Sequence, residues 1–187
     1  MRKIRVPVGA GVPALLIAAM LLAFGLLPAR AGAVEPGQPA PSFAARALEG
    51  DSTLNLAQYK GKVVFLDFWA SWCQPCQTAM PLIESLRQEF PAEQFQVLAV
   101  NVDQDPNKAK AFLARKKVGY PSVSDPEGRL PATYGLKTMP TSYLIDKNGV
   151  VRAVHAGFRS SDMDGLRAEI RALIGTPAVP ANAEAKR

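Results

Sequence analysis

A near-continuous apolar run, Val63 to Trp69, leads directly into the only two cysteines of this 187-residue chain, Cys73 and Cys76. Such a run suits a strand of a parallel sheet that is covered on both faces. A disulfide that closes so short a loop removes little entropy from the unfolded chain, so it would add little stability. On a strand-to-helix turn, one sulfur would instead lie at a helix N-terminus, where unpaired N–H groups stabilise a thiolate. The pair therefore indicates thiol chemistry.

Predicted strands and helices alternate along the rest of the chain. The predicted strands cover 42–47, 53–56, 63–69, 94–102, 120–123, 142–146 and 150–156, and the predicted helices cover 76–90, 107–117, 130–134 and 160–174. The first two strands form a short hairpin, and Asn148-Gly149 supplies the positive φ needed to turn the last two strands into another. Strands separated by helices predict an α/β layered structure with a mixed sheet.

The first 33 residues have the pattern of a targeting segment. Three basic residues among the first five precede an uncharged stretch over 6–27, and the small residues Ala31-Gly32-Ala33 follow. The pattern predicts a signal peptide cleaved after Ala33. An uncleaved membrane anchor is the alternative, because about 20 apolar residues suffice to span a bilayer. Both place the domain outside the cytoplasm, so we expect a periplasmic protein, either free or anchored to the inner membrane.

Proline-rich segments bound the predicted domain. We expect 34–41 to be a linker, 42–175 to be the folded domain and 176–187 to be a mobile tail. The net charge of +6 comes largely from the leader, because residues 1–33 carry four basic residues and no acidic one. The remainder has 18 basic and 16 acidic residues, so no nucleic-acid partner is expected. His155 is the only histidine, which excludes a multi-histidine metal site, and we expect a monomer without bound metal.

Three further residues accompany the cysteine pair. Asp67 interrupts the apolar strand. Burial would raise its pKa and suit it to accept a proton from the second thiol, whereas the alternative is a solvated carboxylate at a sheet edge. Pro81 falls within the helix pattern, where it removes a backbone hydrogen bond. Pro140 precedes a predicted strand, and X-Pro bonds are the ones that can be cis.

Together these residues resemble the thioredoxin superfamily, and most of all its exported TlpA/ResA-type branch. The resemblance is carried by Phe68-Trp69-Ala70-Ser71-Trp72-Cys73-Gln74-Pro75-Cys76, by Pro81 five residues later, and by Met139-Pro140-Thr141 before the last hairpin. It covers about 36–175. It implies a thioredoxin-like three-layer sandwich with a mixed central sheet, an N-terminal β-hairpin and a central αβ insertion.

The resemblance also implies roles for the site residues. Cys73 would be the nucleophile and Cys76 would resolve the mixed disulfide. Pro140 would be cis and face the sulfurs, and the Met139 backbone would pair with a bound substrate strand. The neighbouring residues Trp72, Gln74 and Pro75 would contact the substrate. The Cys73–Cys76 disulfide would be the only redox group, with no separate cofactor.

The predicted function is thiol–disulfide exchange in the direction that reduces disulfides of client proteins. Gln74-Pro75 places no cation between the cysteines, which favours a reduction potential nearer about −270 mV than about −120 mV. By resemblance, a membrane electron donor of the thiol-reducing type would resupply electrons, and cytochrome c or copper-site maturation is a suggested role. Ala79 stands where this branch often has a glutamate linked to apocytochrome c reduction, and Asp67 stands where it often has asparagine.

Two alternatives belong to other functional classes. A copper-binding metallochaperone would use the two thiolates to hold Cu(I). A thiol peroxidase would use Cys73 to attack a peroxide.

Overall fold

The computed structural model of the chain describes residues 32–176. Nearly all of the predicted signal peptide or anchor and nearly all of the predicted tail lie outside these residues. None of the helices in the described part of the chain is both long and apolar enough to cross a membrane.

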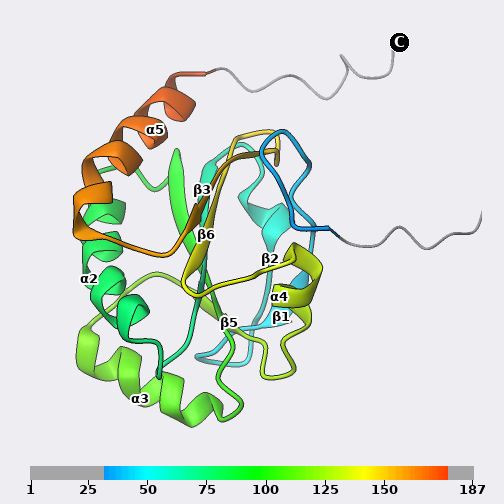
Figure 1. Cartoon of the computed structure of the whole chain (residues 1–187), viewed down its shortest axis with the longest axis vertical. Helices are drawn as coiled ribbons and strands as arrows, with labels where there is room; N and C mark the ends of the chain where they lie inside the picture. Colours follow the sequence, from blue (N-terminus) through cyan, green and yellow to red (C-terminus); the bar gives the residue numbers. More distant parts are fainter. Residues whose placement is uncertain (1–31, 177–187) are drawn as a thin grey trace, which may run out of the picture. The chain divides into compact units, whose positions relative to one another are not determined.

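A five-stranded mixed sheet forms the centre of the fold, with the strand order β5-β4-β3-β6-β7 (Figure 1). The strands are β3 (Val63–Trp69), β4 (Phe95–Asn101), β5 (Ser122–Ser124), β6 (Thr141–Ile145) and β7 (Val151–Ala156). β3, β4 and β5 run parallel, whereas β6 is antiparallel to both β3 and β7. β3 is the central strand and is buried along its whole length, as its apolar sequence predicts.

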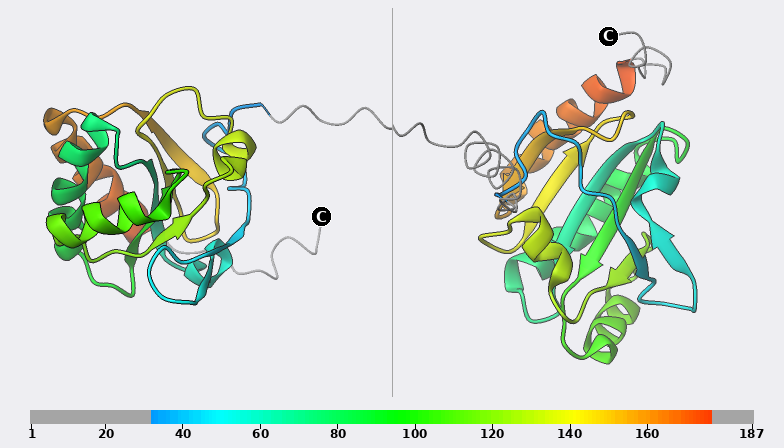
Figure 2. Two further views of the ribbon diagram at one scale, coloured as in Figure 1. Left: turned by 90° about the horizontal axis from the view of Figure 1, so that it is seen from below. Right: turned by 90° about the vertical axis from the view of Figure 1, so that its right-hand side faces the viewer.

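Helices cover one face of the sheet and shorter segments cover the other. α2 (Gln74–Gln88), α3 (Pro106–Lys116) and α5 (Met163–Gly175) pack against the first face. The other face packs against α4 (Arg129–Tyr134), the 3-10 helix η2 (Leu56–Tyr59) and the N-terminal segment, which Figure 2 shows on the side away from α2. The predicted three-layer α/β sandwich is therefore confirmed.

Alternation along the strands divides the core into two halves. Phe65 and Val97 belong to the half beneath α2, whereas Val64 and Leu98 belong to the half beneath α4. Successive side chains of a strand point to opposite faces, so Asp67 lies on the same face as Phe65 and faces the helix that carries Cys76.

The predicted hairpin and insertion are both present. β1 (Ala44–Arg46) pairs antiparallel with β2 (Thr53–Asn55), and Ala47 bridges to Val123 of β5. α3 and β5 form the central αβ insertion between β4 and α4. The hairpin and the insertion thus lie together at the β5 edge of the sheet.

The prediction of a linker over 34–41 needs correction, because this segment is bound to the β7 edge. Gly37 N–H donates to the Val151 carbonyl oxygen at 2.8 Å, and Val151 N–H donates to the Gln38 carbonyl oxygen at 2.9 Å. Val34 is buried in the half of the core beneath α4. An edge strand offers unpaired N–H and C=O groups, and this segment satisfies several of them. Proline content indicated only that the segment is irregular.

Two smaller predictions also differ in detail. In the last hairpin only Gly149 of the Asn148-Gly149 pair has positive φ, at 84°. The predicted final helix begins as a 3-10 turn over Ser160–Asp162 before α5. These differences concern the ends of elements and leave the topology unchanged.

Candidate active site

The two cysteines form a disulfide at the start of α2. Their Sγ atoms are 2.03 Å apart, and Cys73 is the N-cap of the helix. The backbone N–H of Cys76 donates to Cys73 Sγ at 3.3 Å, and this contact would also stabilise a thiolate there. Pro75 lies in the first helical turn, where an N–H group is not needed. Cys73 is 5% exposed and Cys76 is fully buried, so Cys73 is the sulfur nearer to solvent.

A network centred on Asp103 fixes the loop that leads into the cysteines. Asp103 Oδ2 accepts from Ser71 N–H at 2.8 Å and Asp103 Oδ1 accepts from Ser71 Oγ at 2.8 Å. Asn101 Nδ2 donates to Asp103 Oδ2 at 2.7 Å, and Gln77 Nε2 of α2 donates to the Ser71 carbonyl oxygen at 2.7 Å. Asp103 is almost completely buried. The network joins the end of β4 to both sides of the cysteine turn.

Sequence reasoning did not identify Asp103 or Asn101 as site residues. A usable signal was present, because both follow or end a buried parallel strand next to the strand that leads into Cys73. The carboxyl ends of neighbouring parallel strands meet at one edge of a sheet, where functional side chains gather.

Two tryptophans beside the cysteines have different environments. Trp69 is fully buried, packs against Phe112 of α3 with the two rings tilted, and donates from Nε1 to Ser122 Oγ at 3.1 Å. Trp72 is 66% exposed and is the one large apolar side chain exposed on the described surface. Gln74 and Pro75 are also exposed. The accessible surface next to the disulfide is therefore uncharged and partly aromatic.

Asp67 is buried, at 1% exposure, on the face of the sheet that α2 covers. The alternative of a solvated edge carboxylate is wrong, because Asp67 lies in the middle strand between Ala99 and Ser142. Desolvation raises its pKa to about 7, although the hydrogen bond from Ser142 Oγ at 2.8 Å opposes the rise. A carboxyl with this pKa can both accept and release a proton near neutral pH.

The Met139–Pro140 peptide bond is cis, as the family resemblance implies. Thr141 pairs with Phe68, so this turn lies beside the end of β3 from which the cysteine loop leaves. Pro140 is buried, and its carbonyl oxygen accepts from Gly157 N–H at 2.8 Å. Met139 packs on the half of the core that includes both cysteines. Within residues 32–176, its own backbone N–H and C=O make no hydrogen bond.

No group of three or more His, Cys, Asp or Glu side chains in the described residues is arranged to hold a metal ion. His155 instead pairs with Glu169, with 3.0 Å between Nε2 and Oε2.

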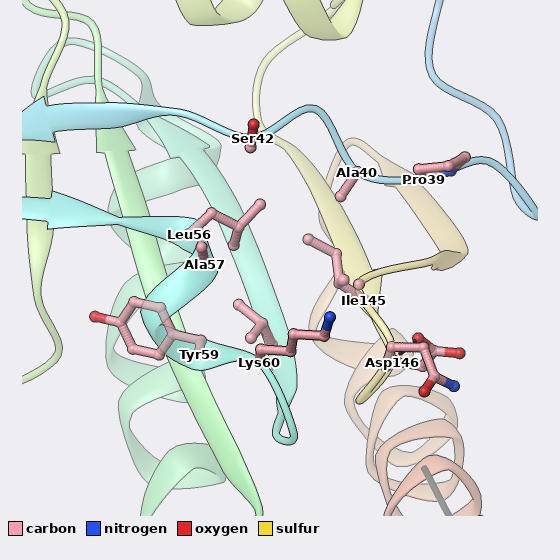
Figure 3. A pocket seen from close by; sticks show the side chains of 12 residues that line it. Pro39, Ala40, Ser42, Leu56, Ala57, Tyr59, Lys60, Ile145 and Asp146 are labelled. Carbon is pink, nitrogen blue, oxygen red and sulfur yellow. Dashed lines mark hydrogen bonds between the residues drawn. The ribbon is translucent and has the colours of Figure 1, made fainter. Parts of the chain in front are cut away.

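An apolar depression of about 230 Å³ lies at the other end of the sheet (Figure 3). Leu56, Tyr59 and Ile145 line it, and Lys60 extends across it. Val64, near the start of β3, also lines it, whereas the cysteines follow the end of that strand. The depression is therefore separate from the cysteine site.

A cysteine pair at a helix N-terminus, a buried carboxyl behind it and a cis-proline turn beside it define a thioredoxin-like thiol–disulfide site. The chain belongs to the AhpC/TSA family, which matches residues 36–154. It is a TlpA/ResA-type member of the thioredoxin superfamily and a thiol–disulfide oxidoreductase, so its clients are proteins with disulfides.

Named relatives agree with this assignment. The chain is 38% identical over 125 residues to the thiol-disulfide oxidoreductase ResA of Geobacillus thermodenitrificans, covering 67% of this chain and 71% of the relative. It is 35% identical over 127 residues to the thioredoxin-like protein YneN of Bacillus subtilis, covering 66% and 73%. A crystal structure described as a thiol:disulfide interchange protein DsbE from Chlorobium tepidum has a TM-score of 0.73 and 41% identity, covering 76% of this chain and all of that one.

Proposed function

We propose that this oxidoreductase works as a reductant, in which the Cys73/Cys76 dithiol reduces disulfides of client proteins. The observation that carries the proposal is the buried carboxyl of Asp67 behind an uncharged cysteine surface. An ionised carboxylate near the pair disfavours a thiolate, and no cation stands between the cysteines to offset it. Within the described residues, the contact that would stabilise a Cys73 thiolate comes from a neutral N–H donor at the start of α2. This balance favours the disulfide form of the enzyme as the stable product.

The proposed reaction has two steps. The Cys73 thiolate attacks the client disulfide, whose S–S bond breaks to release one client thiolate as the mixed disulfide forms. Asp67 then takes the proton of the Cys76 thiol, and the Cys76 thiolate attacks the Cys73 sulfur. The mixed disulfide breaks, the second client sulfur leaves as a thiolate, and two electrons have passed to the client.

The client-binding surface would be formed by Trp72, Gln74, Pro75 and the Met139–Pro140 turn. The Met139 backbone groups have no partner within the described residues, which supports pairing with an extended client segment. Trp72 offers an exposed aromatic contact next to the reactive sulfur.

The leader pattern supports a periplasmic location, with the domain released by cleavage after Ala33 or anchored through residues 6–27. A reductant in an oxidising compartment needs electrons, so we propose a membrane donor of the thiol-reducing type and a monomeric enzyme. Cytochrome c maturation is one client process that the family resemblance suggests. Ala79 is buried and stands where this branch often has a glutamate. The resemblance therefore does not identify the client.

Trapping tests the proposed roles of the two cysteines. In a Cys76→Ser variant the mixed disulfide on Cys73 cannot be resolved, so client proteins should accumulate covalently and be released by dithiothreitol. A matched Cys73→Ser variant should trap nothing. Equal trapping by both variants, or trapping on Cys76 alone, would refute the assignment of Cys73 as the nucleophile. Identification of the trapped clients then decides whether apocytochrome c is among them.

A further inference from the structure

Two buried side-chain polar atoms in the described residues have no hydrogen-bond partner, Asp67 Oδ2 and the Tyr120 hydroxyl. Buried polar groups are nearly always paired, with protein or with ordered water, so each unpaired one calls for a physical reason. One of these atoms belongs to the carboxyl that we propose as the proton acceptor. The coincidence of two such atoms in one half of the core suggests a common explanation.

The sheet register places Asp67 on the face beneath α2, and core packing places Tyr120 on the same face. Asp67 is paired with Ala99, and Ala99 is paired with Ser122, so these three side chains share a face. Tyr120 lies two positions before Ser122 and packs into the same half of the core as Ala99 and Cys76. The Tyr120 ring is therefore buried on the side of the sheet to which the Asp67 carboxyl points.

The electrostatics agree with this proximity. Burial raises the pKa of Tyr120 well above 10, and the negative charges of Asp67 and Glu84 raise it further. Tyr120 therefore keeps its proton at every pH at which the enzyme works. Its hydroxyl can only act as a donor towards a carboxylate.

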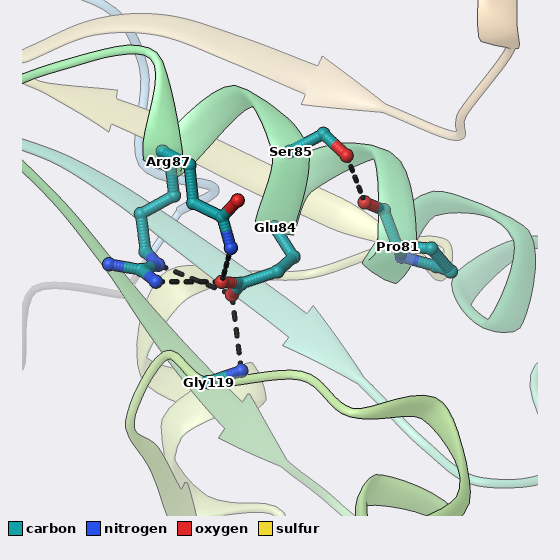
Figure 4. Close-up of polar contacts among 6 residues, drawn as sticks. Pro81, Glu84, Ser85, Arg87 and Gly119 are labelled. Atoms are coloured by element: carbon teal, nitrogen blue, oxygen red, sulfur yellow. Dashed lines mark hydrogen bonds and ion pairs between the residues drawn. The ribbon is translucent and has the colours of Figure 1, made fainter.

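The backbone before Tyr120 is clamped to the helix that carries Cys76. Glu84 of α2 accepts from Gly119 N–H at 3.1 Å, and Arg87 Nη2 and Gln88 Nε2 each donate to Glu84 Oε1 at 2.7 Å (Figure 4). Burial opposes ionisation of Glu84, but these hydrogen bonds and the charge of Arg87 outweigh it and lower its pKa. The clamp fixes Tyr120 relative to both α2 and the sheet.

We propose that the Tyr120 hydroxyl is a positioning group for Asp67, donating to Oδ2 through one buried water while Ser142 donates to Oδ1. The inference rests on the proposed role of Asp67 as proton acceptor. Two donors would favour the carboxylate and keep it basic near neutral pH, despite burial that favours the neutral acid. Tyr120 would act only through Asp67 and would not touch the client.

Replacement of Tyr120 by phenylalanine tests this directly, because Phe keeps the ring and removes only the hydroxyl. The Asp67 carboxyl is titrated by carbon-13 NMR in the oxidised enzyme, in which the cysteines do not titrate. The other titratable groups around this position are Tyr120, Glu84 on α2, and His155 with Glu169 beyond Ser142. We expect Tyr120→Phe to raise the pKa of Asp67 by about one unit. The Cys76-dependent resolution step should slow about fivefold at pH 7, because fewer Asp67 carboxyls are ionised there, and recover at pH 9.

Tyr143→Phe is the matched control, because it also removes one buried tyrosine hydroxyl. That hydroxyl donates to the Tyr134 carbonyl oxygen at 3.1 Å, in the other half of the core. This variant should lose stability without moving the titration of Asp67. If Tyr120→Phe leaves that titration unchanged, the inference is overturned. An Asp67→Asn variant with the wild-type pH profile would instead refute the role of Asp67, whatever Tyr120 does to the titration.

Discussion

At the scale of single residues, the candidate site contains a carboxyl whose burial in the core is energetically unfavourable. Asp67 lies in the middle of a fully buried strand and receives one protein hydrogen bond, from Ser142. An apolar residue would be more stable there. Packing does not explain the position, and its strongly shifted pKa supports the proposed role of Asp67 in proton transfer.

Asp67→Asn should change how stability depends on pH. Because folding raises the pKa of Asp67 from 3.8 to about 7, the folded state binds the proton more tightly. Proton binding by Asp67 therefore contributes fully to the free energy of unfolding below about pH 4, and this contribution is lost as the pH rises to about 7. The free energy of unfolding changes by up to about 4 kcal/mol over this range. The variant should therefore be more stable than wild type at pH 8, with little difference at pH 4, by urea denaturation of the oxidised forms.

Asp51→Asn is a suitable control for this measurement, because Asp51 is a fully solvated carboxylate paired only with exposed Arg46. It should not alter the pH dependence by more than a few tenths of a kcal/mol. Equal stability curves for wild type and Asp67→Asn across this pH range would mean that folding does not raise the pKa of Asp67.

Trp72→Ala should separate client binding from redox chemistry. Trp72 is exposed and contributes to no core cluster, so its loss should change the free energy of unfolding by less than about 0.5 kcal/mol. The expected effect is a several-fold rise in KM for a protein disulfide, with little change for a small disulfide such as oxidised glutathione. An equal loss of rate on both substrates would show that Trp72 acts on the cysteines instead.

At the scale of elements, hydrogen bonds from neighbouring elements fix the conformation of the cysteine turn. Ser71 is bound by Asp103 after β4 and by Gln77 within α2. α2 continues through Pro81 to Gln88, and Ser85 Oγ donates to the Pro81 carbonyl oxygen at 3.1 Å (Figure 4). Strand, turn and helix thus form one rigid support for the disulfide.

Asp103→Asn tests this support. The carboxylate accepts from Ser71 N–H, Ser71 Oγ and Asn101 Nδ2, and an amide can accept on one atom only. We expect a loss of about 2–3 kcal/mol in the free energy of unfolding and a slower exchange rate. Denaturation measures the free energy of unfolding, and insulin reduction measures the exchange rate.

The matched control is Asp105→Ala, two residues further along. Asp105 only caps α3, accepting from Asn107 N–H at 3.0 Å, so its loss should cost about 1 kcal/mol. Exchange by this variant should stay at the wild-type rate. A wild-type exchange rate for Asp103→Asn as well would contradict a supporting role for Asp103.

Local patterns predicted the features that single segments determine. The apolar run of β3 and the helix after the cysteines were accessible because each follows from nearby residues, and the cis bond at Pro140 was implied by the family resemblance. The roles of Asp103 and Tyr120 were not predicted from the sequence, since they depend on which strands become neighbours in the sheet. The binding of 34–41 to the β7 edge was missed for the same reason.

At the scale of the whole molecule, the segment over 34–41 belongs to the fold. Val34 is buried, and its N–H donates to the Tyr134 carbonyl oxygen at 3.1 Å. Val34→Ala should therefore lower the free energy of unfolding by about 1–2 kcal/mol. Glu35→Ala, at an exposed neighbour, should be nearly neutral. Denaturation curves that do not distinguish the two variants would favour the original interpretation as a linker.

The Cys73/Cys76 dithiol is proposed to act as a reductant of client disulfides. Equilibration of the domain with glutathione buffers of known ratio, followed by alkylation of free thiols, gives its reduction potential. The buried carboxyl of Asp67 and the uncharged Gln74–Pro75 pair predict a value near about −270 mV. A value near about −120 mV, typical of a strong oxidant, would contradict the proposed direction of electron flow.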